Sequence, residues 1–443
     1  MQAEAIFGQV ADAARACGVT EVEAIIASSS HALTRFANNE IHQNVAENAM
    51  HLSVRPLIDG RTARASTNRL DRDGIRAAVE EAIAITHLTE RDPDLPRLAD
   101  STVYEPVERH FESTARATPQ QRAAAAAGAI GAVEQAGQTA AGTYSTGEEF
   151  FALLNSRGVA ASYRESMARF SITAMAQDSS GWTKASACDR GAIDPIALAQ
   201  CAASKAAAFL TPRELAPGRY TAILEPAAVL DLVGQMFADF SATAIRDGRS
   251  FLNDRIGKLI FGENVTIHDD AYHPLQAGAP FDGEGVPRRR LTLVERGVVR
   301  DIAYSRAAAA LAGAKQTGHG FPLPNELGEA PVNIVIAGGD SSVEQMIAST
   351  DAGILVTRLW YIREVDPYEK IFTGMTRDGT FLVESGRVAA AVRNFRFNQS
   401  LIEMLCHVEA LSQPVRAAGE EIFDMVVPAM KVGGFHFTEV TRF

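Results

Sequence analysis

Apolar and polar residues recur along the chain with two periods, one typical of helices and one typical of strands. Residues 5–16 place apolar side chains at helical spacing and end before Gly18, which predicts a helix with a glycine C-cap. From Glu21 onward apolar residues recur at every second position, with turn residues at Asn38-Asn39 and Asp59-Gly60. This pattern predicts an antiparallel meander after the first helix.

The pattern returns to helical spacing over residues 71–86, which begin with acidic residues in the first turn. Residues 88–112 are rich in proline and charge and predict a long surface connection. Thr118 and Pro119 form a helix-start signal, and the alanine-rich segment after them predicts a helix to about Gln135. Further elements are expected in the same half, namely strands within residues 139–187 and a helix over residues 195–209.

A segment with two prolines and a glycine, residues 210–218, separates two parts of different pattern. We therefore predict an N-terminal α+β domain over residues 1–212 and a C-terminal strand-rich domain over residues 213–443. Strands in the second part are expected over residues 290–295, 298–304, 332–337, 354–361, 372–376 and 388–396, with hairpin turns at Glu295-Arg296-Gly297 and Glu384-Ser385-Gly386. The predicted fold class is α+β, with helices and an antiparallel sheet followed by a barrel- or sandwich-like sheet.

The composition is that of an ordinary globular protein and excludes a disulfide-stapled miniprotein. The chain has 443 residues, of which 47% are hydrophobic and 22% charged, enough to bury large cores without crosslinks. Its formal charge is −12, and its one tight basic run, Arg288-Arg289-Arg290, is too short to follow a phosphate backbone. Nucleic acid is therefore not expected as a direct partner. The four cysteines form no C-x-x-C pair, which predicts reduced structural thiols.

Neither a secretion signal nor a membrane span is expected. Residues 1–5 lack a basic region, and the longest apolar stretches, such as residues 123–133, are too short to cross a bilayer. We therefore predict a soluble protein of the cytoplasm with no membrane partner.

The common catalytic and cofactor motifs are absent from the sequence. Neither a phosphate-binding loop nor a G-x-S-x-G elbow occurs, so nucleotide binding and serine hydrolysis are not expected. Residues 268–273 hold four potential metal ligands, but histidines five positions apart do not share a helix face, and the two aspartates near Pro274 are typical of a solvated turn. His319 lies between two glycines on a loop, where a surface or capping position is favoured over contact with a ligand.

Two further segments combine polar side chains with aromatic or sulfur-containing ones. Cys406 and His407 lie in residues 401–411, an apolar stretch that predicts a helix with the cysteine in the core. Residues 357–368 (T-R-L-W-Y-I-R-E-V-D-P-Y) predict a strand. Because successive side chains of a strand point to opposite faces, one face is expected to carry Arg358, Trp360 and Ile362. The other face is expected to carry Leu359, Tyr361 and Arg363. Either one aromatic side chain is core and the other lines a groove, or both are structural.

Several segments resemble, in the same order, those of one known family. They are T-R-F-A-N-N-E-I-H-Q-N at residues 34–44, P-F-D-G-E-G-V-P at 280–287, T-G-H-G at 317–320 and T-R-L-W-Y-I-R-E-V-D-P at 357–367. The order continues through F-T-G, D-G-T-F-L-V-E-S-G-R-V and N-F-R-F-N-Q-S to V-P-A-M-K-V near the C-terminus. Together they identify the chain as a member of the TldD/PmbA family, whose older label is modulator of DNA gyrase.

The resemblance implies an intracellular metallopeptidase built from two homologous subunits. In the TldD-type subunit a helix carries H-E-x-x-x-H, where two histidines and a C-terminal cysteine hold zinc and the glutamate is the general base. The corresponding window here has Leu230 and Gln235 at the histidine positions and Asp231 at the glutamate, and Cys406 lies too far before V-P-A-M-K-V to be the cysteine ligand. The resemblance therefore implies a PmbA (TldE)-type subunit with no catalytic residue, metal ligand or cofactor of its own. The apolar residues around Leu230 predict that it is a core residue.

Three functions remain as hypotheses. The first is a PmbA-type subunit that pairs with a zinc-bearing TldD-type subunit to cleave unstructured peptides or small proteins; its candidates for peptide binding are Arg358, Tyr361, Arg363 and His319. The second is a self-sufficient homodimeric peptidase with an unrecognised site around Asp231, His268 or His319. The third is a non-enzymatic peptide-binding or regulatory protein.

Overall fold

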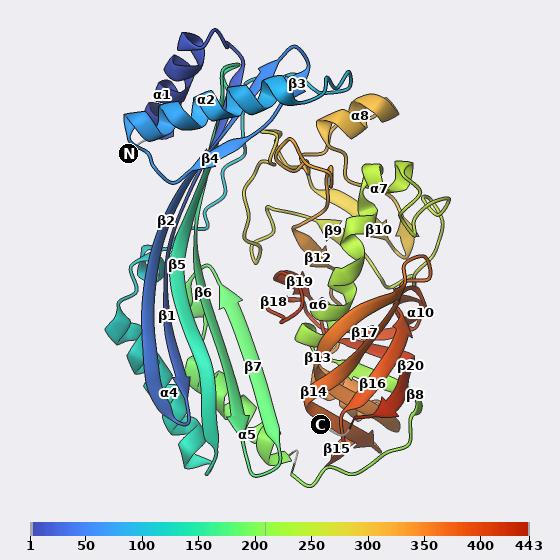
Figure 1. Cartoon of the computed structure of the whole chain (residues 1–443). Coiled ribbons are helices and arrows are strands. Elements are labelled where there is room, and N and C mark those ends of the chain that lie inside the picture. The colour runs from blue at the N-terminus through green and yellow to red at the C-terminus, as the bar shows by residue number, and fades with distance from the viewer. Residues whose placement is uncertain (1–2, 209, 442–443) are drawn as a thin grey trace.

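The computed structural model describes residues 3–208 and 210–441. A long curved sheet with helices at both ends forms the N-terminal half, and it lies beside a C-terminal half that contains two further sheets (Figure 1). The predicted α+β class, with a strand-rich second half, is confirmed. The division into domains at residues 212 and 213 stays a prediction.

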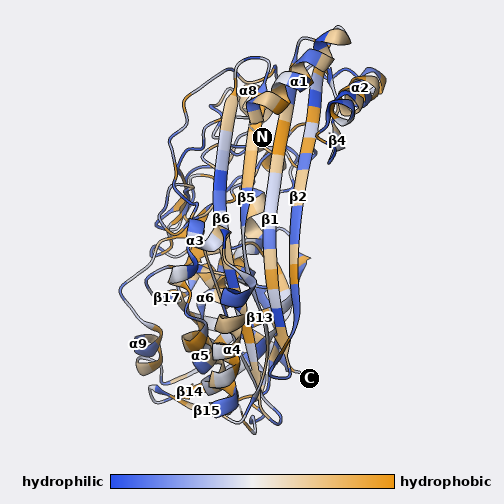
Figure 2. Ribbon diagram, turned by 90° about the vertical axis from the view of Figure 1, so that its left-hand side faces the viewer, coloured by the Kyte–Doolittle hydropathy of each residue, from blue (hydrophilic) through white to orange (hydrophobic). Residues whose placement is uncertain are grey.

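The first sheet is the antiparallel meander that the alternating pattern predicts. Its strands follow the order β3-β2-β1-β5-β6-β7, and β4 pairs with β2. Their bounds are β1 Val22–Ala37, β2 Glu40–Ile58, β3 Arg61–Thr62, β4 Ala65–Thr67, β5 Thr139–Asn155, β6 Ala160–Met175 and β7 Ser180–Ala187. The long strands lie side by side, and hydrophilic and hydrophobic residues alternate along them (Figure 2).

Four predicted hairpin turns are confirmed, two in each half of the chain. Each has two central residues with positive φ, the conformation that matches the twist of paired antiparallel strands. They are Asn38-Asn39 (51° and 61°), Asp59-Gly60 (48° and 73°), Arg296-Gly297 (48° and 77°) and Ser385-Gly386 (50° and 76°).

Helices cover the two ends of the first sheet. The pair α1 (Ala3–Ala16) and α2 (Arg72–Leu88) packs at one end, and the pair α4 (Pro119–Gln135) and α5 (Pro195–Ala208) packs at the other. The start of α4 is the predicted one, because Thr118 accepts a hydrogen bond from the Gln121 backbone and closes a capping box. Shorter turns are α3 (Glu112–Ala115) and the 3-10 turn η1 (Arg190–Ala192). The predicted last residue of the helix at 195–209 lies outside the described residues.

The strands of the largest C-terminal sheet form a closed circuit, in line with the predicted barrel-like sheet. The order β13-β8-β20-β16-β14 is closed by direct pairing of β13 with β14. The bounds are β8 Gly218–Leu224, β13 Ala352–Asp366, β14 Ile371–Glu384, β16 Phe395–Ser400 and β20 Met430–Val440, with β15 Arg387–Ala391 and β17 Val408–Leu411 added at its sides.

The C-terminal half contains a second sheet. Its strands are β11 Val298–Val299, β10 Leu291–Glu295, β9 Ile267–Asp269, β12 Ile334–Ile336, β19 Met425–Val427 and β18 Val415–Ala417, in that order. The remaining helical segments are α6 Pro226–Val233, η2 Gly234–Phe240, α7 Ala242–Arg246, α8 Arg306–Ala312, α9 Val343–Ala348 and α10 Leu401–Cys406.

Three predicted elements of the second half differ from the structure. The strand expected over residues 298–304 ends at Val299, and residues 388–396 divide between two strands, β15 and β16. The helix expected over residues 401–411 ends at Cys406, because Val408 pairs with Val432 and begins the strand β17. Pairing with β20 overrides the helical pattern in that segment.

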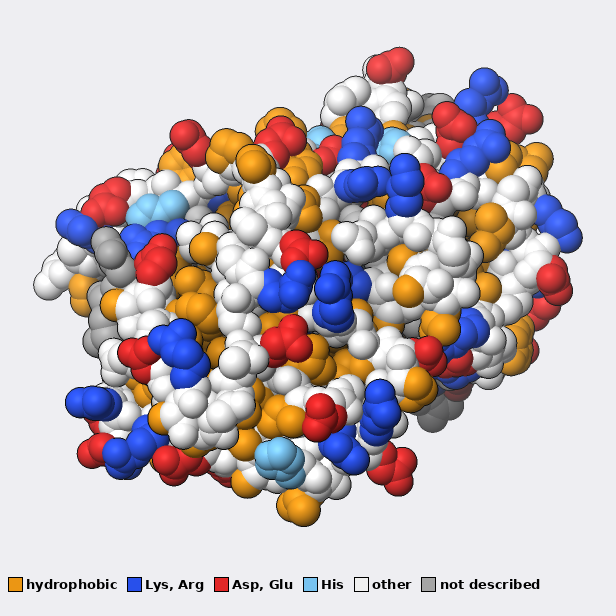
Figure 3. Space-filling model, turned by 90° about the horizontal axis from the view of Figure 1, so that it is seen from above, with side chains coloured by type: hydrophobic (Ala, Val, Ile, Leu, Met, Phe, Trp, Pro, Cys, Tyr) orange, Lys and Arg blue, Asp and Glu red, His pale blue; other side chains and the backbone are white. Residues whose placement is uncertain are grey.

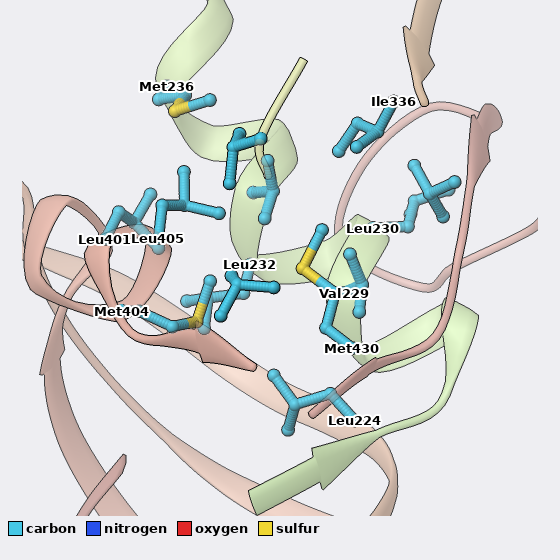
Figure 4. Packing of buried hydrophobic residues seen from close by; sticks show 14 of the residues in the cluster. Leu224, Val229, Leu230, Leu232, Met236, Ile336, Leu401, Met404, Leu405 and Met430 are labelled. Atoms are coloured by element: carbon cyan, nitrogen blue, oxygen red, sulfur yellow. The ribbon is translucent and has the colours of Figure 1, made fainter. Parts of the chain in front are cut away.

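The main hydrophobic core of the C-terminal half is built around α6. Every side chain from Ala228 to Val233 is buried, so this helix is covered on all sides. Figure 4 shows Leu230 and Leu232 of α6 among leucine and methionine side chains from β8, β20 and α10. The helix is a central packing element of the fold.

The surface carries charges of both signs. On the face seen from above, acidic and basic side chains are interspersed with apolar ones (Figure 3). Within the described residues, no helix is both long enough and apolar enough to cross a membrane.

Candidate functional site

The helix α6 and the 3-10 turn η2 that follows it carry the three residues that the resemblance places at the zinc-binding motif. Leu230 is fully buried in the hydrophobic core, which confirms the expectation from its apolar neighbours. Asp231 is also fully buried. Gln235 lies in the next turn, η2, and its side-chain amide donates a hydrogen bond to the backbone carbonyl of Asp231 (3.1 Å).

The carboxylate of Asp231 is held by a loop far along the chain. Its Oδ1 accepts hydrogen bonds from the backbone N–H groups of Glu420 (3.1 Å) and Glu421 (3.0 Å). The loop approaches so closely that a Cβ at Gly419 would lie 2.0 Å from Asp231 Oδ1 and 2.4 Å from the Leu230 side chain. Only glycine fits there. Burial raises the pKa of Asp231 to about 6, against the lowering effect of the two backbone hydrogen bonds.

These three residues do not fit a zinc ion. Leu230 offers no donor atom, the Gln235 amide is used within the helix, and the Asp231 carboxylate is engaged by backbone N–H groups. Zinc sites in proteins use thiolate, imidazole and carboxylate ligands that converge on one point. Within residues 3–208 and 210–441, no three His, Cys, Asp or Glu side chains are grouped in this way.

The Asp231→Asn variant is expected to be at least as stable as the parent protein at pH 8. An acid whose pKa is raised by folding binds more protons in the native state, so its contribution to stability falls as the pH rises from about 4 to about 6. Asparagine removes this loss and keeps an oxygen for both N–H groups. Its advantage over the parent, about 1 kcal/mol or more at pH 8, is expected to vanish below pH 4.

Urea unfolding of both proteins at several pH values measures this difference. Asp231→Ala is the matched comparison, because it removes the acceptor and leaves the same N–H groups unpaired, at a cost of about 1–3 kcal/mol. A lower stability of the Asn variant at pH 8 would contradict the expectation.

The strand β13 does not keep the alternation that its sequence predicts. Tyr361 has a positive φ of 56°, and the pairing register with β14 shifts between Trp360 and Arg363. This bulge places Leu359 and Ile362 in the core, whereas Tyr361 is 51% exposed and Trp360 half-buried. The prediction that one of the two aromatic side chains is core is therefore wrong, because both line the same cavity, whereas the alternative that both are structural stays a prediction.

The bulge is tied to the loop that holds Asp231. The backbone N–H of Tyr361 donates to Glu421 Oε1 (2.7 Å), and the Arg363 guanidinium lies 3.5 Å from Glu421 Oε2. The same guanidinium covers the Tyr361 ring at 4.4 Å. Glu421 thus links β13 to Asp231, a role for which the sequence has no signal, because the partners lie far apart along the chain.

Arg358, a candidate for peptide binding, is a buried structural residue. Its side chain is 8% exposed and forms an ion pair with Asp378, which is 7% exposed. The guanidinium stacks on Trp182 of β7 at 4.6 Å. The position is internal because β7 of the first sheet packs against β14 at this point, so Arg358 supports the cavity rather than facing a ligand.

His319 is buried, and the predicted surface or capping position is wrong. The side chain is fully buried, its Nδ1 lies 3.0 Å from Thr317 Oγ1, and its Nε2 lies 3.0 Å from Asp269 Oδ1, outside the angle of a hydrogen bond. Although burial raises it, contact with the His319 side chain and a hydrogen bond from the Asn333 backbone N–H hold the pKa of Asp269 at about 2. Only one of the two aspartates expected in a solvated turn lies there, because Asp269 belongs to the buried strand β9. Its partner His319 is also buried, so a bound peptide cannot reach that side chain.

The remaining candidates are dispersed. His268 and His273 are half-buried on separate elements. Cys406 is exposed rather than in the core, because α10 ends there, and its thiol donates to the backbone carbonyl of Ile260 (3.1 Å). Neither histidine joins Asp231 or Cys406 in a group of metal ligands within the part of the chain that the structure describes.

The P-F-D-G-E-G-V-P segment forms a buried acidic turn, a site that the sequence motif alone does not predict. Asp282 accepts hydrogen bonds from the backbone N–H groups of Glu284 (2.9 Å), Val286 (2.8 Å) and Gly320 (2.8 Å). Burial and the neighbouring Asp282 raise the pKa of Glu284 to about 8, while its carboxyl accepts a hydrogen bond from the Arg306 N–H (2.8 Å). The turn thus holds the T-G-H-G loop through the Gly320 N–H.

Comparison with known proteins places this fold. A metalloprotease of Methanothermobacter thermautotrophicus is 24% identical over 287 residues, which span 61% of each chain. The chain therefore spans less than two thirds of the length of this curated relative.

Two solved structures cover almost the whole chain. TldE from Thermococcus kodakarensis has a TM-score of 0.87 at 21% identity, covering 98% of this chain and 99% of that one. A Thermotoga maritima protein described as a candidate modulator of a DNA gyrase has a TM-score of 0.88 at 20% identity, covering 99% and 100%.

Three family domains match in succession along the sequence. Residues 22–86 match PmbA/TldA metallopeptidase domain 1, residues 109–210 match the central domain, and residues 217–439 match the C-terminal domain. The resemblance found in the sequence motifs is confirmed over nearly the whole chain. This chain belongs to the PmbA/TldD metallopeptidase family.

Proposed function

We propose that this chain is the PmbA-type, non-catalytic subunit of a peptidase complex that acts on unstructured peptides or small proteins. The observation that carries the proposal is the state of α6, where core packing and backbone hydrogen bonds take up the positions of the family's zinc ligands. A zinc-bearing TldD-type homologue as the partner and a cytoplasmic location are parts of the same proposal.

The environment of Asp231 supports a structural rather than a chemical role. In a zinc peptidase the general base must reach a water molecule beside the scissile bond. The Asp231 carboxylate is fully buried beneath Gly419 and directed at two backbone N–H groups. In this proposal the partner activates water, and this chain binds and orients the peptide.

The exposed part of β13 is the proposed peptide-binding wall. Tyr361 and Arg363 remain candidates for contact, because both side chains are more than half exposed. An extended peptide can be held by main-chain hydrogen bonds that require no particular sequence, while nearby pockets select its side chains. This binding mode suits substrates without fixed structure.

The free edge of β2 is a surface on which the homologous subunit, or a second copy of this chain, can dock. Between residues 40 and 51 this strand pairs with β1 on one side, and β3 and β4 reach only its last part. Val45 and Met50 on this stretch are each 42% exposed. An unpaired edge with exposed apolar side chains is a common site of strand addition between subunits.

The purified chain alone is expected to hold far less than one zinc ion and to leave unfolded peptides intact. Mixing it with the TldD-type homologue of the same cell is expected to produce cleavage of the same peptides. Elemental analysis after desalting, followed by mass spectrometry of the peptide mixture, measures both properties. The TldD-type subunit alone is the comparison for zinc content.

Two results would contradict the proposal. About one zinc per chain, retained against a weak chelator and accompanied by cleavage, would favour the self-sufficient homodimer. Peptide binding by this chain with no effect on the activity of the TldD-type subunit would favour the non-enzymatic peptide-binding protein.

A further inference from the structure

A cavity of about 720 Å³ lies between the two halves of the molecule. The turn between β6 and β7 forms one side, with residues 175–180, and β13 and β14 form the other, with Trp360, Tyr361 and residues 375–378. Its volume lies within the range of about 300–1,000 Å³ that is usual for small-ligand pockets. The cavity begins at the exposed end of the proposed peptide-binding wall.

The bulge in β13 places two aromatic side chains in this cavity. Regular alternation would have sent Trp360 and Tyr361 to opposite faces of the strand. The positive φ of Tyr361, unfavourable for a bulky residue by about 1–3 kcal/mol, sends both to the same side. Since Glu421 accepts the Tyr361 N–H at 2.7 Å, the surrounding structure maintains this backbone conformation.

Two guanidinium groups pack on the Trp360 indole and fix the orientation of its ring. The Arg377 guanidinium lies over its ring at 4.9 Å, and Arg358 lies over the same ring at 5.7 Å. Met175 and Met375 line the cavity nearby and provide polarisable side chains that adapt to a ring.

The arginines around the indole lie close to carboxylates of the protein. Asp378 bonds to Arg358 and to Ser180 of the opposite wall. Arg377 lies 3.6 Å from the same aspartate, and Arg396 lies 3.8 Å from Glu439. Because each of these cations has a carboxylate within 4 Å, the lining favours a neutral planar group over a phosphate or a carboxylate.

We propose that this cavity binds an aromatic side chain of an extended peptide, with Trp360 as the stacking surface and Tyr361 at its entrance. The inference rests on the proposed peptide-binding function and adds a side-chain preference to it. Stacking of a ring on aromatic and guanidinium planes is worth more than apolar burial alone, so the cavity discriminates phenylalanine from an aliphatic residue of similar size.

The test uses the full chain and unstructured synthetic peptides that differ only at one central position, Phe, Leu or Ala. Binding is measured by isothermal titration, and a change in tryptophan emission reports occupation of the cavity, since the second tryptophan, Trp182, is 4% exposed and does not line it. The Phe peptide is expected to bind at least about tenfold more tightly than the Ala peptide and to change the emission.

Variants locate the preference in the cavity. Trp360→Ala is expected to reduce the Phe-to-Ala ratio to less than about threefold, whereas Trp360→Phe is expected to preserve it. Tyr368→Ala is the matched control, because Tyr368 is 54% exposed near the same end of β13 but lies outside the cavity. Thermal unfolding of every variant separates loss of binding from loss of fold, and Arg377→Ala replaces Trp360→Ala if the latter does not fold.

The outcomes distinguish the inference from the function on which it rests. Equal affinity for the three peptides, or a preference that survives Trp360→Ala or its replacement, would overturn the aromatic subsite and leave peptide binding intact. Failure of every peptide to bind would overturn both.

Discussion

Replacing Glu23 with glutamine is expected to lower the free energy of unfolding by about 3–5 kcal/mol. Glu23 and Arg55 are direct cross-strand partners in β1 and β2, and their side chains are 1% and 2% exposed. The carboxylate accepts hydrogen bonds from Arg55 Nε (3.1 Å) and Nη2 (3.0 Å) and from Arg64 Nη2 (2.5 Å). Glutamine preserves the shape but leaves a buried arginine without its counter-ion.

The same cluster connects the first sheet to the C-terminal half. Arg64 also donates a hydrogen bond to the backbone carbonyl of Leu323, in the segment that follows the T-G-H-G loop. Although burial opposes it, the Arg55 and Arg64 guanidinium groups hold the pKa of Glu23 below its usual value. The contribution of Glu23 to stability is therefore present above its ordinary pKa of about 4.3 and is lost as the pH falls further.

Chemical denaturation at pH 7 measures the effect of Glu23→Gln. Arg76→Gln is the control, because it breaks an exposed pair with Asp73, for which less than about 1 kcal/mol is expected. Equal effects of the two substitutions would show that the buried cluster contributes no more than a surface ion pair.

The parts of the fold that could be predicted from the sequence are those specified by neighbouring residues. Alternating apolar positions and the pairs Asn38-Asn39 and Asp59-Gly60 define the first hairpins, since these turn types accept few other residues. The start of α4 at Thr118 is equally local, because the capping partners lie three residues apart.

The candidate site depends on contacts between distant segments, and there the sequence was insufficient. The motif comparison located the altered window at Leu230 to Gln235, but Asp231 meets its partner loop 189 residues later. The local sequence pattern of β13 does not predict the bulge. Tyr361 has a positive φ there, and its N–H donates to Glu421, a residue 60 positions later in the chain. The bulge places Ile362 rather than Tyr361 in the core.

The same reasoning explains the wrong prediction for His319. Between two glycines, a histidine has the local character of a flexible surface loop. Its environment is instead determined by Asp269, which reaches it from β9, and by Asp282, which binds the backbone N–H of the adjacent Gly320. A lone histidine in a sequence carries no sign of a buried carboxylate 50 residues before it.

His319→Ala is accordingly expected to destabilise the protein by about 3 kcal/mol or more. Both side chains of the Asp269–His319 pair are fully buried, so the substitution leaves a carboxylate in the core without its imidazole partner and opens space beside it. Backbone N–H groups of Val332 (2.7 Å) and Asn333 (2.8 Å) still bind Asp269, and these remaining bonds limit the loss. Because the pKa of Asp269 is depressed to about 2, the parent protein loses this contribution only below about pH 4.

A double-mutant cycle separates the charge from the cavity. Asp269→Asn in the His319→Ala background removes the unpaired charge while keeping an acceptor for the two N–H groups, so part of the stability is expected to return. His42→Ala, at an exposed position of β2, is the control and is expected to change stability by less than about 0.5 kcal/mol. If the stability lost in the double variant equalled the sum of the losses in the two single variants, the side chains would not be coupled. The loss in His319→Ala would then come from packing around residue 319, and the Asp269–His319 contact would not hold the T-G-H-G loop against β9.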